Sequence, residues 1–500
     1  MLTRRTLLGG GLALAGLGLT GRAGASARSG PDWNRLRGCL TGDLVLPGDA
    51  AYPAAKQLDS GYFDTIAPQG VAYCETVDDV RTVLSFAQYN DLHLAVRSGG
   101  HSAAGWSTTT GLVLDTSRLR GLTLGTSTVA LGPGAHGVDA VGTLSPQGLA
   151  LITGSCPTVC AGGYVQGGGF GPLSRKNGMA CDRLVCADVV LADGSVVRAD
   201  ADHHPDLFWA LRGGGGGNFG VVTRYEVRPV EISRLPTYSL TWPFAAAPRV
   251  IAAFQQWMLA APDDLEGNLT VVKAGPTPTV IVGGSWQGGD PVGLEPYLDA
   301  LVSAAGTTPA SRTVTDLSYR DAMMRAFGCA DKTTEQCHRS GDNPDAALAR
   351  HTFSSGRGRM LSTALPAAGI DEALAAFTAP GSASQFSVMN ISWLGGRINR
   401  VRRTDTAYVH RNTVALLGFN ATLPTSAPTP DDDAAVAAWT AGGKAVADRY
   451  GNGENYQNTV DASLTDWRTA YYAENYPRLT QVKRRYDPAA FFRFPQAIGA

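Results

Sequence analysis

Two glycine-rich stretches, each containing one nucleophilic side chain, constrain this chain more than any other feature. The first is RSGGHS at residues 97–102, and the second is TGSCPTVCAGGYVQGGGFGPL at residues 153–173. Neither stretch has the apolar periodicity of a packed helix or strand, and glycine allows backbone to approach a ligand closely. His101 in the first stretch and Cys156 in the second therefore predict two loops that hold one large anionic cofactor from two sides.

Length and composition favour an ordinary globular protein with two domains. The chain has 500 residues, of which 44% are hydrophobic and 17% are charged, so it can bury a large core. Lys and Arg number 42, Asp and Glu number 43, and basic residues form only short groups. This balance gives no indication of a nucleic-acid partner or of binding to an anionic membrane surface.

Residues 1–27 have the pattern of an export signal. Arg4 and Arg5 precede a short segment of Gly, Ala and Leu, and the small residues at 23–27 offer a cleavage site. The pattern resembles a twin-arginine signal, so we expect a secreted protein that is free of the membrane after cleavage. An uncleaved anchor is the alternative, although the apolar segment is short and rich in glycine for a membrane span.

Eight cysteines in an exported chain indicate disulfide bonds. Cys329 and Cys337 form the favoured pair, because they close the polar loop GCADKTTEQCH, which has little else to hold it. Spacing alone does not fix the other connections. Two further pairs are considered, namely Cys39 with Cys74 and Cys181 with Cys186.

The region from about residue 66 to residue 231 predicts a β-α-β unit followed by short strands and helices. A strand at 71–73 precedes a capping-box helix that begins at Thr76, and a strand at 94–96 ends at Arg97. This order places RSGGHS at a strand end, where ligand-binding loops are common. Further strands are predicted at 112–114, 128–131, 188–191, 195–198 and 221–227, and short helices at 136–144 and 205–211.

The glycine run at 213–220 is not a dinucleotide-binding fingerprint. Such a loop follows a strand, opens a helix and is followed about 20 positions later by an acidic residue. The run at 213–220 follows a predicted helix and opens a predicted strand, while the run at 167–171 is followed by Pro172. A Rossmann unit is therefore excluded at both places.

From about Ile232 the pattern changes to that of a second domain. Strand-like runs at 269–273 and 279–282 alternate with helical stretches at 250–259 and 294–304, which predicts an antiparallel sheet covered by helices. The tail contains the aromatic-rich ENYQNTVD and a predicted helix, RLTQVKRRYDPAAFF. The expected divisions are a signal at 1–27, a cofactor domain at 28–231, a substrate domain at 232–449 and a returning tail at 450–500.

The ordered motifs resemble the berberine-bridge-enzyme-like FAD oxidases. RSGGHS is followed by GSCPTVCAGGYVQGGGFGPLSRKNG, ADVVLADG, DLFWALRGGGGGNFGVVT, YQN and a final YDPAAFF. The resemblance is strong over 68–223 and over the last 50 residues, and only general over 233–440. It implies an α+β fold in which a two-part FAD-binding domain of the PCMH type, found in vanillyl-alcohol-oxidase-type proteins, is joined to the substrate domain.

The resemblance also implies that FAD is attached by two covalent bonds. His101 would bond the flavin 8α-methyl group and Cys156 would bond C6, and imidazole and thiolate are the side chains suited to such additions near neutral pH. Relatives usually have glycine four residues after the linking cysteine, whereas this chain has Cys160. The Cys-Pro-Thr-Val sequence favours Cys156, but the second thiol keeps the alternative open.

The same motifs imply the remaining cofactor contacts. The backbone N–H groups of residues 98–102 are expected to form an anion nest at the pyrophosphate, with Arg97 as a supporting charge. The expected cofactor-binding residues are Arg97, Ser98, Gly99, Gly100, Ser102, Thr153, Gly154, Ser155, Thr158, Val159, Gly162, Gly163, Gly168, Gly169, Gly220, Val222 and Asn458.

In the family, hydride passes from a C–H beside a hydroxyl to flavin N5, and O2 then reoxidises the flavin to give H2O2. Tyr456 in the YQN motif is the expected base, although a phenol with a free pKa near 10 needs help at neutral pH. The alternative is that Tyr456 and Asn458 only pack the tail against the flavin. No titratable helper precedes Gly395 and Gly396, and Trp393 is expected to line the substrate cleft.

The expected substrate is a secondary alcohol of a sugar, an oligosaccharide, or a glycosylated or polyketide natural product, with O2 as the second reactant. Oxidative cyclisation or desaturation is an alternative, and a flavin-containing protein that binds a drug without turnover is another. His410 and Arg411 resemble a structural element of the family. His203 and His204 match no metal motif, and no metal site is expected.

Overall fold

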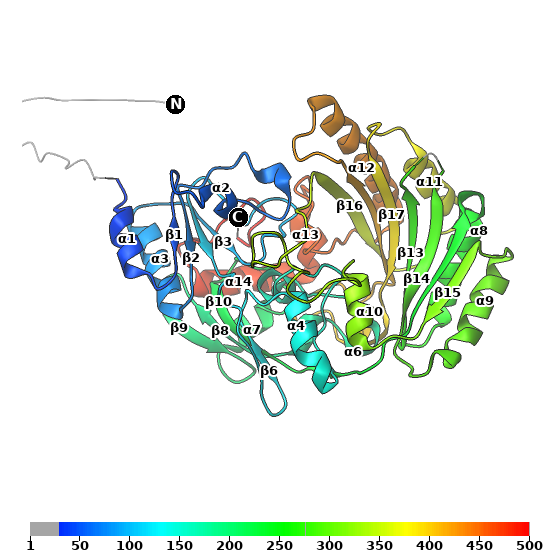
Figure 1. Cartoon of the computed structure of the whole chain (residues 1–500), viewed down its shortest axis with the longest axis horizontal. Coiled ribbons are helices and arrows are strands. Elements are labelled where there is room, and N and C mark those ends of the chain that lie inside the picture. The colour runs from blue at the N-terminus through cyan, green and yellow to red at the C-terminus, as the bar shows by residue number, and fades with distance from the viewer. Residues whose placement is uncertain (1–29, 276, 500) are drawn as a thin grey trace, which may run out of the picture.

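The computed structural model describes residues 30–275 and 277–499, so the predicted signal at 1–27 lies outside the described residues. Within that part of the chain, strands form sheets of four, five, two and seven strands. Two halves lie side by side, one built from the early part of the chain and the other around the seven-stranded sheet (Figure 1). None of the helices described is long and apolar enough to cross a membrane.

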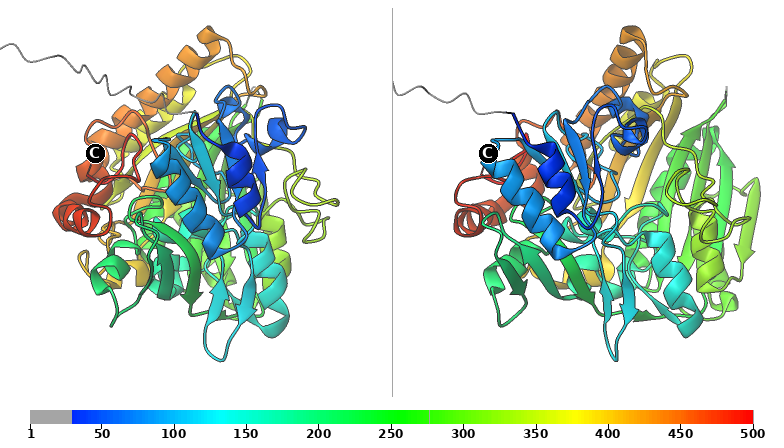
Figure 2. Two further views of the ribbon diagram at one scale, coloured as in Figure 1. Left: turned by 90° about the vertical axis from the view of Figure 1, so that its left-hand side faces the viewer. Right: turned by 60° about the vertical axis from the view of Figure 1, so that its left-hand side comes forward.

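The four-stranded sheet carries the first predicted loop. Its order is β1 (Leu44–Val45), β2 (Gly70–Tyr73), β4 (Leu112–Asp115) and β3 (Leu94–Arg97), and β2 and β3 both run parallel to β4. Helix α3 (Val77–Tyr89) connects β2 to β3, and the expected capping box between Thr76 and Asp79 is present. Helix α1 (Trp33–Cys39) lies beside α3 (Figure 2). RSGGHS therefore begins at the last residue of β3.

The five-stranded sheet is antiparallel and forms the second part of this half. Its order is β5 (Leu122–Leu124), β6 (Val129–Leu131), β10 (Val221–Val227), β8 (Leu184–Val190) and β9 (Val196–Ala199). A small pair joins β7 (Leu149–Ala150) to β11 (Val230–Glu231). The helices of this region and of the entry segment are α2 (Tyr52–Ala55), α4 (Gly137–Leu144), α5 (Ala161–Gln166), α6 (Ser174–Asn177) and α7 (Pro205–Ala210). Because the glycine run at 213–220 lies between α7 and β10, the exclusion of a Rossmann unit is confirmed.

The seven-stranded sheet is antiparallel throughout, and helices cover one of its faces (Figure 1). Its order is β15 (Ser311–Thr315), β12 (Thr237–Pro243), β14 (Thr279–Trp286), β13 (Leu265–Lys273), β17 (Phe386–Trp393), β18 (Ala415–Thr422) and β16 (Ser354–Leu361). The helices are α8 (Ala247–Ala260), α9 (Glu295–Ala305), α11 (Ala367–Thr378) and α12 (Pro430–Tyr450), and α10 (Tyr319–Ala326) lies towards the first half. The expected α+β fold is confirmed.

Alternation along β17 corrects the expectation for Trp393. Successive strand residues point to opposite faces of a sheet. Met389, Ile391 and Trp393 all belong to the apolar core between the sheet and its helices, and the Trp393 ring packs edge-on against Phe254 of α8. Trp393 is 5% exposed. It therefore packs under a helix and does not line a cleft.

The tail returns to the first half of the molecule. Helices α13 (Trp467–Tyr472) and α14 (Tyr476–Tyr486) share one apolar core with β8 and β10. The predicted tail helix was too long, because α14 ends at Tyr486. Pro488 follows, and the Asp487 carboxylate instead accepts hydrogen bonds from the backbone of residues 491 and 492 and from Lys483.

Of the three disulfide pairs considered, only Cys329–Cys337 is present, with Cα atoms 5.9 Å apart. Pairing of Cys39 with Cys74 was wrong, because Cys39 is exposed on α1 whereas Cys74 is buried after β2. The pair of Cys181 and Cys186 was also wrong. Cys181 packs in an apolar cluster, and the Cys186 thiol lies on β8 and donates to Glu226 at 3.1 Å.

Candidate active site and cofactor cavity

The two glycine-rich loops meet, as their sequences predict. The Nε2 atom of His101 lies 3.0 Å from the Thr158 hydroxyl oxygen. A Cβ atom at Gly99 would come within 3.0 Å of the Cys160 backbone nitrogen, so a larger residue there would push the loops apart. Glycine at 99 thus permits a close contact between the strand-end loop and the loop that carries Cys156.

A cavity of about 490 Å³ opens between these loops, the glycine run at 215–217 and the tail. Its volume is within the range typical of cofactor sites, roughly 300–1,000 Å³. Twelve residues expected at the cofactor site or its attachments line it: Ser98, Gly99, Gly100, His101, Ser102, Cys156, Val159, Gly162, Gly163, Gly220, Val222 and Asn458.

The lining fits FAD chemically. Four buried polar atoms that line the cavity have no hydrogen-bond partner among the described residues: Ser107 Oγ, Thr108 Oγ1, Tyr164 OH and Gln496 Oε1. Buried polar atoms are normally satisfied, so these atoms indicate a polar ligand. Among the described residues that line the cavity, Arg493 is the only Lys or Arg, which favours an anion nest of backbone N–H groups over a basic clamp.

Arg97 does not reach the cavity. It is 4% exposed, forms an ion pair with Asp115 and donates to the Ala55 carbonyl oxygen at 2.8 Å. Its charge is paired with Asp115 at the end of β3 and it is absent from the cavity lining, so a supporting role of Arg97 at the pyrophosphate stays a prediction. Thr153 and Gly154 line a small adjoining pocket, Ser155 lines neither pocket, and the Thr158 hydroxyl contacts His101.

The glycines of the run 167–169 make room for side chains instead of touching the cavity. A Cβ atom would come within 1.8 Å of the Asn458 side chain at Gly167, 2.8 Å of the Tyr408 ring at Gly168 and 2.5 Å of the Tyr164 ring at Gly169. Gly168 and Gly169 also have positive φ angles. Neither residue lines the cavity, so direct contact of Gly168 and Gly169 with the cofactor stays a prediction.

His101 is held by an acidic residue that no motif identified. Its Nδ1 atom lies 3.3 Å from an Asp59 carboxylate oxygen, which is also 2.6 Å from His351 Nδ1. Burial lowers the pKa of His101, although the Asp59 charge acts in the opposite direction. The imidazole is therefore uncharged at neutral pH and retains a nitrogen lone pair for bond formation.

The two candidate linking thiols have different surroundings. Cys156 is exposed, whereas Cys160 is 3% exposed and its thiol points to the Gly134 carbonyl oxygen at 3.4 Å. Although Cys156 has exposed surface, the surrounding chain partly desolvates its thiol, and this desolvation together with the negative charge of Asp59 raises the pKa of Cys156. Because Cys156 is exposed and Cys160 is buried, Cys156 is the thiol that a ligand in the cavity can contact.

The Tyr456 hydroxyl accepts two hydrogen bonds. The donors are the Gly169 backbone N–H at 2.8 Å and Asn458 Nδ2 at 2.9 Å. Burial raises the pKa of Tyr456 above its ordinary value, and these two donors act in the opposite direction by favouring the phenolate. Asn458 also donates to the Tyr164 carbonyl oxygen at 3.0 Å, which fixes the orientation of its amide.

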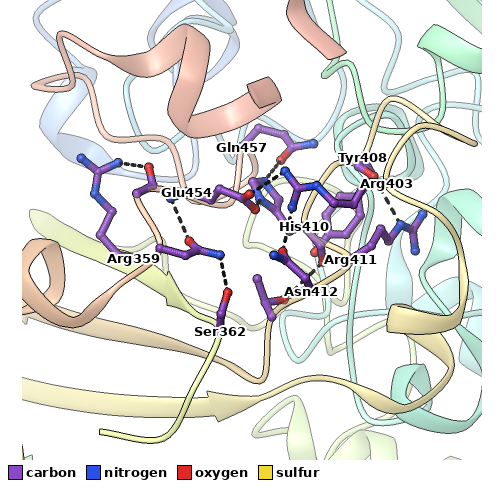
Figure 3. A network of polar contacts seen from close by, with 12 residues as sticks. Arg359, Ser362, Arg403, Tyr408, His410, Arg411, Asn412, Glu454 and Gln457 are labelled. Carbon is purple, nitrogen blue, oxygen red and sulfur yellow. Dashed lines mark hydrogen bonds and ion pairs between the residues drawn. The ribbon is translucent and has the colours of Figure 1, made fainter. Parts of the chain in front are cut away.

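A buried polar network holds the segment that carries Tyr456 (Figure 3). His410 is fully buried, and its two ring nitrogens lie 2.7 Å from Glu454 and 3.1 Å from Gln457. Gln457 donates to the Gly213 carbonyl oxygen, and Arg403 pairs with Glu454 at 2.7 Å. Residues on both sides of Tyr456 are therefore fixed to the rest of the molecule.

The face of the seven-stranded sheet that its helices leave free adjoins Tyr456. Tyr456 packs in one cluster with Met360 and Leu416 of that face. In the same row of the sheet, Leu416 pairs with Ser392, and Ser392 pairs with Asn268. Other polar residues of this face include Glu266, Ser285, Asn390 and Asn420, and burial raises the pKa of Glu266 to about 7.

The known proteins that this chain resembles are FAD-linked oxidoreductases. Residues 68–200 match an FAD binding domain, and residues 455–499 match the family described as berberine and berberine like. An uncharacterized FAD-linked oxidoreductase of Bacillus subtilis, YgaK, is 27% identical over 92% of this chain and 97% of its own length. The chitooligosaccharide oxidase of Gibberella zeae is 28% identical over 93% of this chain and 94% of its own.

Among solved structures, the BBE-like 1 protein of Physcomitrella patens has a TM-score of 0.82 at 22% identity, and the match covers 93% of this chain and 98% of that one. The fold, the cavity and these matches define an enzyme of the FAD-linked oxidoreductase class. Within that class, the chain is similar to the berberine-bridge-enzyme-like proteins, through its FAD binding domain and its tail.

Proposed function

We propose that the protein is an oxidase that removes hydride from a carbon bearing a hydroxyl group, on a sugar, an oligosaccharide or a glycosylated or polyketide natural product. The observation that carries this proposal is the Tyr456 hydroxyl, which is held by two donors beside a cofactor cavity and a polar sheet face. FAD, when bound, supplies the hydride acceptor N5, and O2 restores its oxidised state with release of H2O2.

Tyr456 acts in this reaction as the base that takes the substrate hydroxyl proton. Gly169 and Asn458 stabilise the phenolate that must be present for proton uptake. Gln457 and His410 act as positioning residues, because their side chains hold the tail in place but make no hydrogen bond to the Tyr456 hydroxyl. Proton removal and hydride departure from the same C–OH group then yield a carbonyl product.

The polar sheet face binds the substrate hydroxyl groups. Asn268, Ser392 and Asn390 present amide and hydroxyl groups in adjoining rows next to Leu416 and thus beside Tyr456. Such groups suit a polyhydroxylated ligand, since each can donate and accept hydrogen bonds. Similarity to a chitooligosaccharide oxidase supports a carbohydrate substrate.

FAD is attached through His101 and Cys156 in this proposal, and Asp59 assists at His101. Because Asp59 lies 3.3 Å from His101 Nδ1, its carboxylate orients the ring and takes up the ring proton that attachment displaces.

We further assign residues 28–231 with the tail 450–500 to the cofactor domain and 232–449 to the substrate domain. The protein is exported through its first 27 residues by the twin-arginine pathway.

Asp59→Asn is expected to slow formation of the histidyl bond roughly 10²-fold, since the amide cannot take up the proton. The measurement is the fraction of covalent flavin on digested peptides containing His101, followed over time after FAD is added to the apoprotein. Asp64→Asn is the matched control, because Asp64 lies in the same segment but pairs with Arg350. Equal attachment rates in the two variants would remove Asp59 from this role.

The oxidase proposal is tested by oxygen consumption with mono- and oligosaccharides and with aromatic glycosides. A substrate should give one H2O2 per O2 consumed, and under anaerobic conditions it should bleach the flavin absorbance. Binding of these compounds without bleaching or H2O2 would instead support a protein that binds its ligand without turnover.

A further inference from the structure

Three side chains of metal-ligating type converge outside the cofactor cavity. His136 caps the start of α4, Asp139 lies in its first turn, and His338 follows the disulfide cysteine Cys337. One ligand atom from each residue can be chosen so that all three lie within 4.8 Å of one another. His136 is 7% exposed and His338 is 5% exposed, so both imidazoles are buried.

The hydrogen-bond partners of His338 require a positive charge at its ring, supplied either by a second proton or by a bound metal ion. Its Nδ1 atom lies 2.8 Å from the Thr334 carbonyl oxygen, and its Nε2 atom lies 3.0 Å from Asp139 Oδ1. Both of these partners only accept hydrogen bonds, whereas a neutral imidazole has one N–H. Donation from Nδ1 to the carbonyl leaves a bare Nε2 atom against a carboxylate, unless a second proton or a metal ion lies between them.

His136 faces the other carboxylate oxygen, a contact that a neutral ring with its proton on Nδ1 can satisfy. Its Nδ1 atom lies 3.3 Å from Asp139 Oδ2, and the two imidazole rings meet edge-on with centroids 5.0 Å apart. Two positively charged imidazoles at that distance would repel each other. A single divalent cation would satisfy both rings and the carboxylate together.

We propose that His136, Asp139 and His338 form a binding site for a divalent metal ion, with Zn²⁺ the metal that this ligand set favours. The two nitrogens approach different oxygens of the carboxylate, His338 Nε2 at 3.0 Å from Asp139 Oδ1 and His136 Nδ1 at 3.3 Å from Asp139 Oδ2. A Zn²⁺ with ligands about 2.0–2.1 Å away would therefore be held by both oxygens of Asp139 and one nitrogen of each ring. The contact of His338 with Thr334 is the kind of outer hydrogen bond that fixes a ligating histidine. The Asp139 side chain is 30% exposed, which provides an entry path and leaves the fourth position to water.

The metal would join two parts of the chain. The loop closed by Cys329–Cys337 would be tied to α4, and His136 is itself paired through its backbone with Cys160. The site would therefore help to hold the segment that carries Cys156 in place. Its role is structural, and the proposal does not depend on the substrate or on catalysis.

The test is titration of the chelator-treated holoenzyme with Zn²⁺ by calorimetry, with bound zinc counted after gel filtration. We expect one Zn²⁺ per chain and a thermal midpoint that rises on zinc addition. His338→Gln and Asp139→Asn should each weaken binding by about 10-fold to 100-fold or more, and His203→Gln, at an exposed histidine paired with Asp200, should leave it unchanged.

Two outcomes would overturn the proposal. One is that the wild-type holoenzyme binds no stoichiometric zinc, which would assign the cluster to protonated histidines. The other is that His338→Gln and Asp139→Asn both bind zinc as the wild type does, which would place the metal elsewhere. The two variants alter different segments, so a folding failure in one leaves the other to decide.

Discussion

Tyr456→Phe should lower kcat/KM by about 10²–10⁴-fold, the usual contribution of a general base, while KM changes little. Phenylalanine keeps the ring that packs against Phe170 and Tyr408, so the variant removes the hydroxyl group and little else. Steady-state oxygen consumption gives both constants, and flavin absorbance confirms that the cofactor is retained.

The control for this variant must also lose the hydroxyl group of a buried tyrosine in the tail. Loss of the Tyr456 hydroxyl leaves the Gly169 N–H without its acceptor, which costs about 1–3 kcal/mol of stability. Tyr486→Phe loses a hydrogen bond of 2.7 Å to Asp206 outside the cavity and should retain near wild-type activity. A Tyr456→Phe enzyme within a few-fold of wild type would assign the base role to another group.

The pH dependence follows from the same contacts. Burial raises the pKa of Tyr456, and the base is active only when it is deprotonated, so kcat/KM should increase with pH through the alkaline range. Asn458→Ala removes a donor that favours the phenolate, which raises this pKa further. The alkaline rise in kcat/KM should therefore move to higher pH in that variant, and a move to lower pH would contradict the assignment.

If FAD is attached as proposed, His101→Ala combined with Cys156→Ala should give a protein that releases all its FAD on acid precipitation. Each single variant should retain one bond and stay yellow, because the cavity places the two attachment residues on different loops. The measurement is flavin fluorescence on a denaturing gel, with peptide mapping of the labelled segments.

Cys160→Ala is the matched control for the cysteinyl bond, since its thiol is buried and points to Gly134. It should keep both bonds. Loss of the cysteinyl bond in Cys160→Ala but not in Cys156→Ala would reverse the assignment of the two thiols, and free FAD released from the unsubstituted protein would exclude covalent attachment altogether.

Local sequence patterns determined much of the fold. The capping box at Thr76, the adjacent strands predicted at 188–191 and 195–198, and the strand 221–227 all formed as expected, because each depends on residues close in the chain. The same holds for the disulfide Cys329–Cys337, which closes a loop of neighbouring residues. Motif order likewise identified the loops of His101 and Cys156, which line one cavity.

Only the tertiary structure decided which side chains face the cavity and which partners they meet. Trp393 faces the core because it lies on the face of β17 that the helices cover. The charge of Arg97 is paired with Asp115 on the neighbouring parallel strand. Asp59 meets His351 from 292 residues away, and His338 meets Asp139 from another segment. Such contacts depend on how distant elements pack, which no local spacing encodes, so the sequence indicated the cofactor chemistry whereas packing determined the groups that support it.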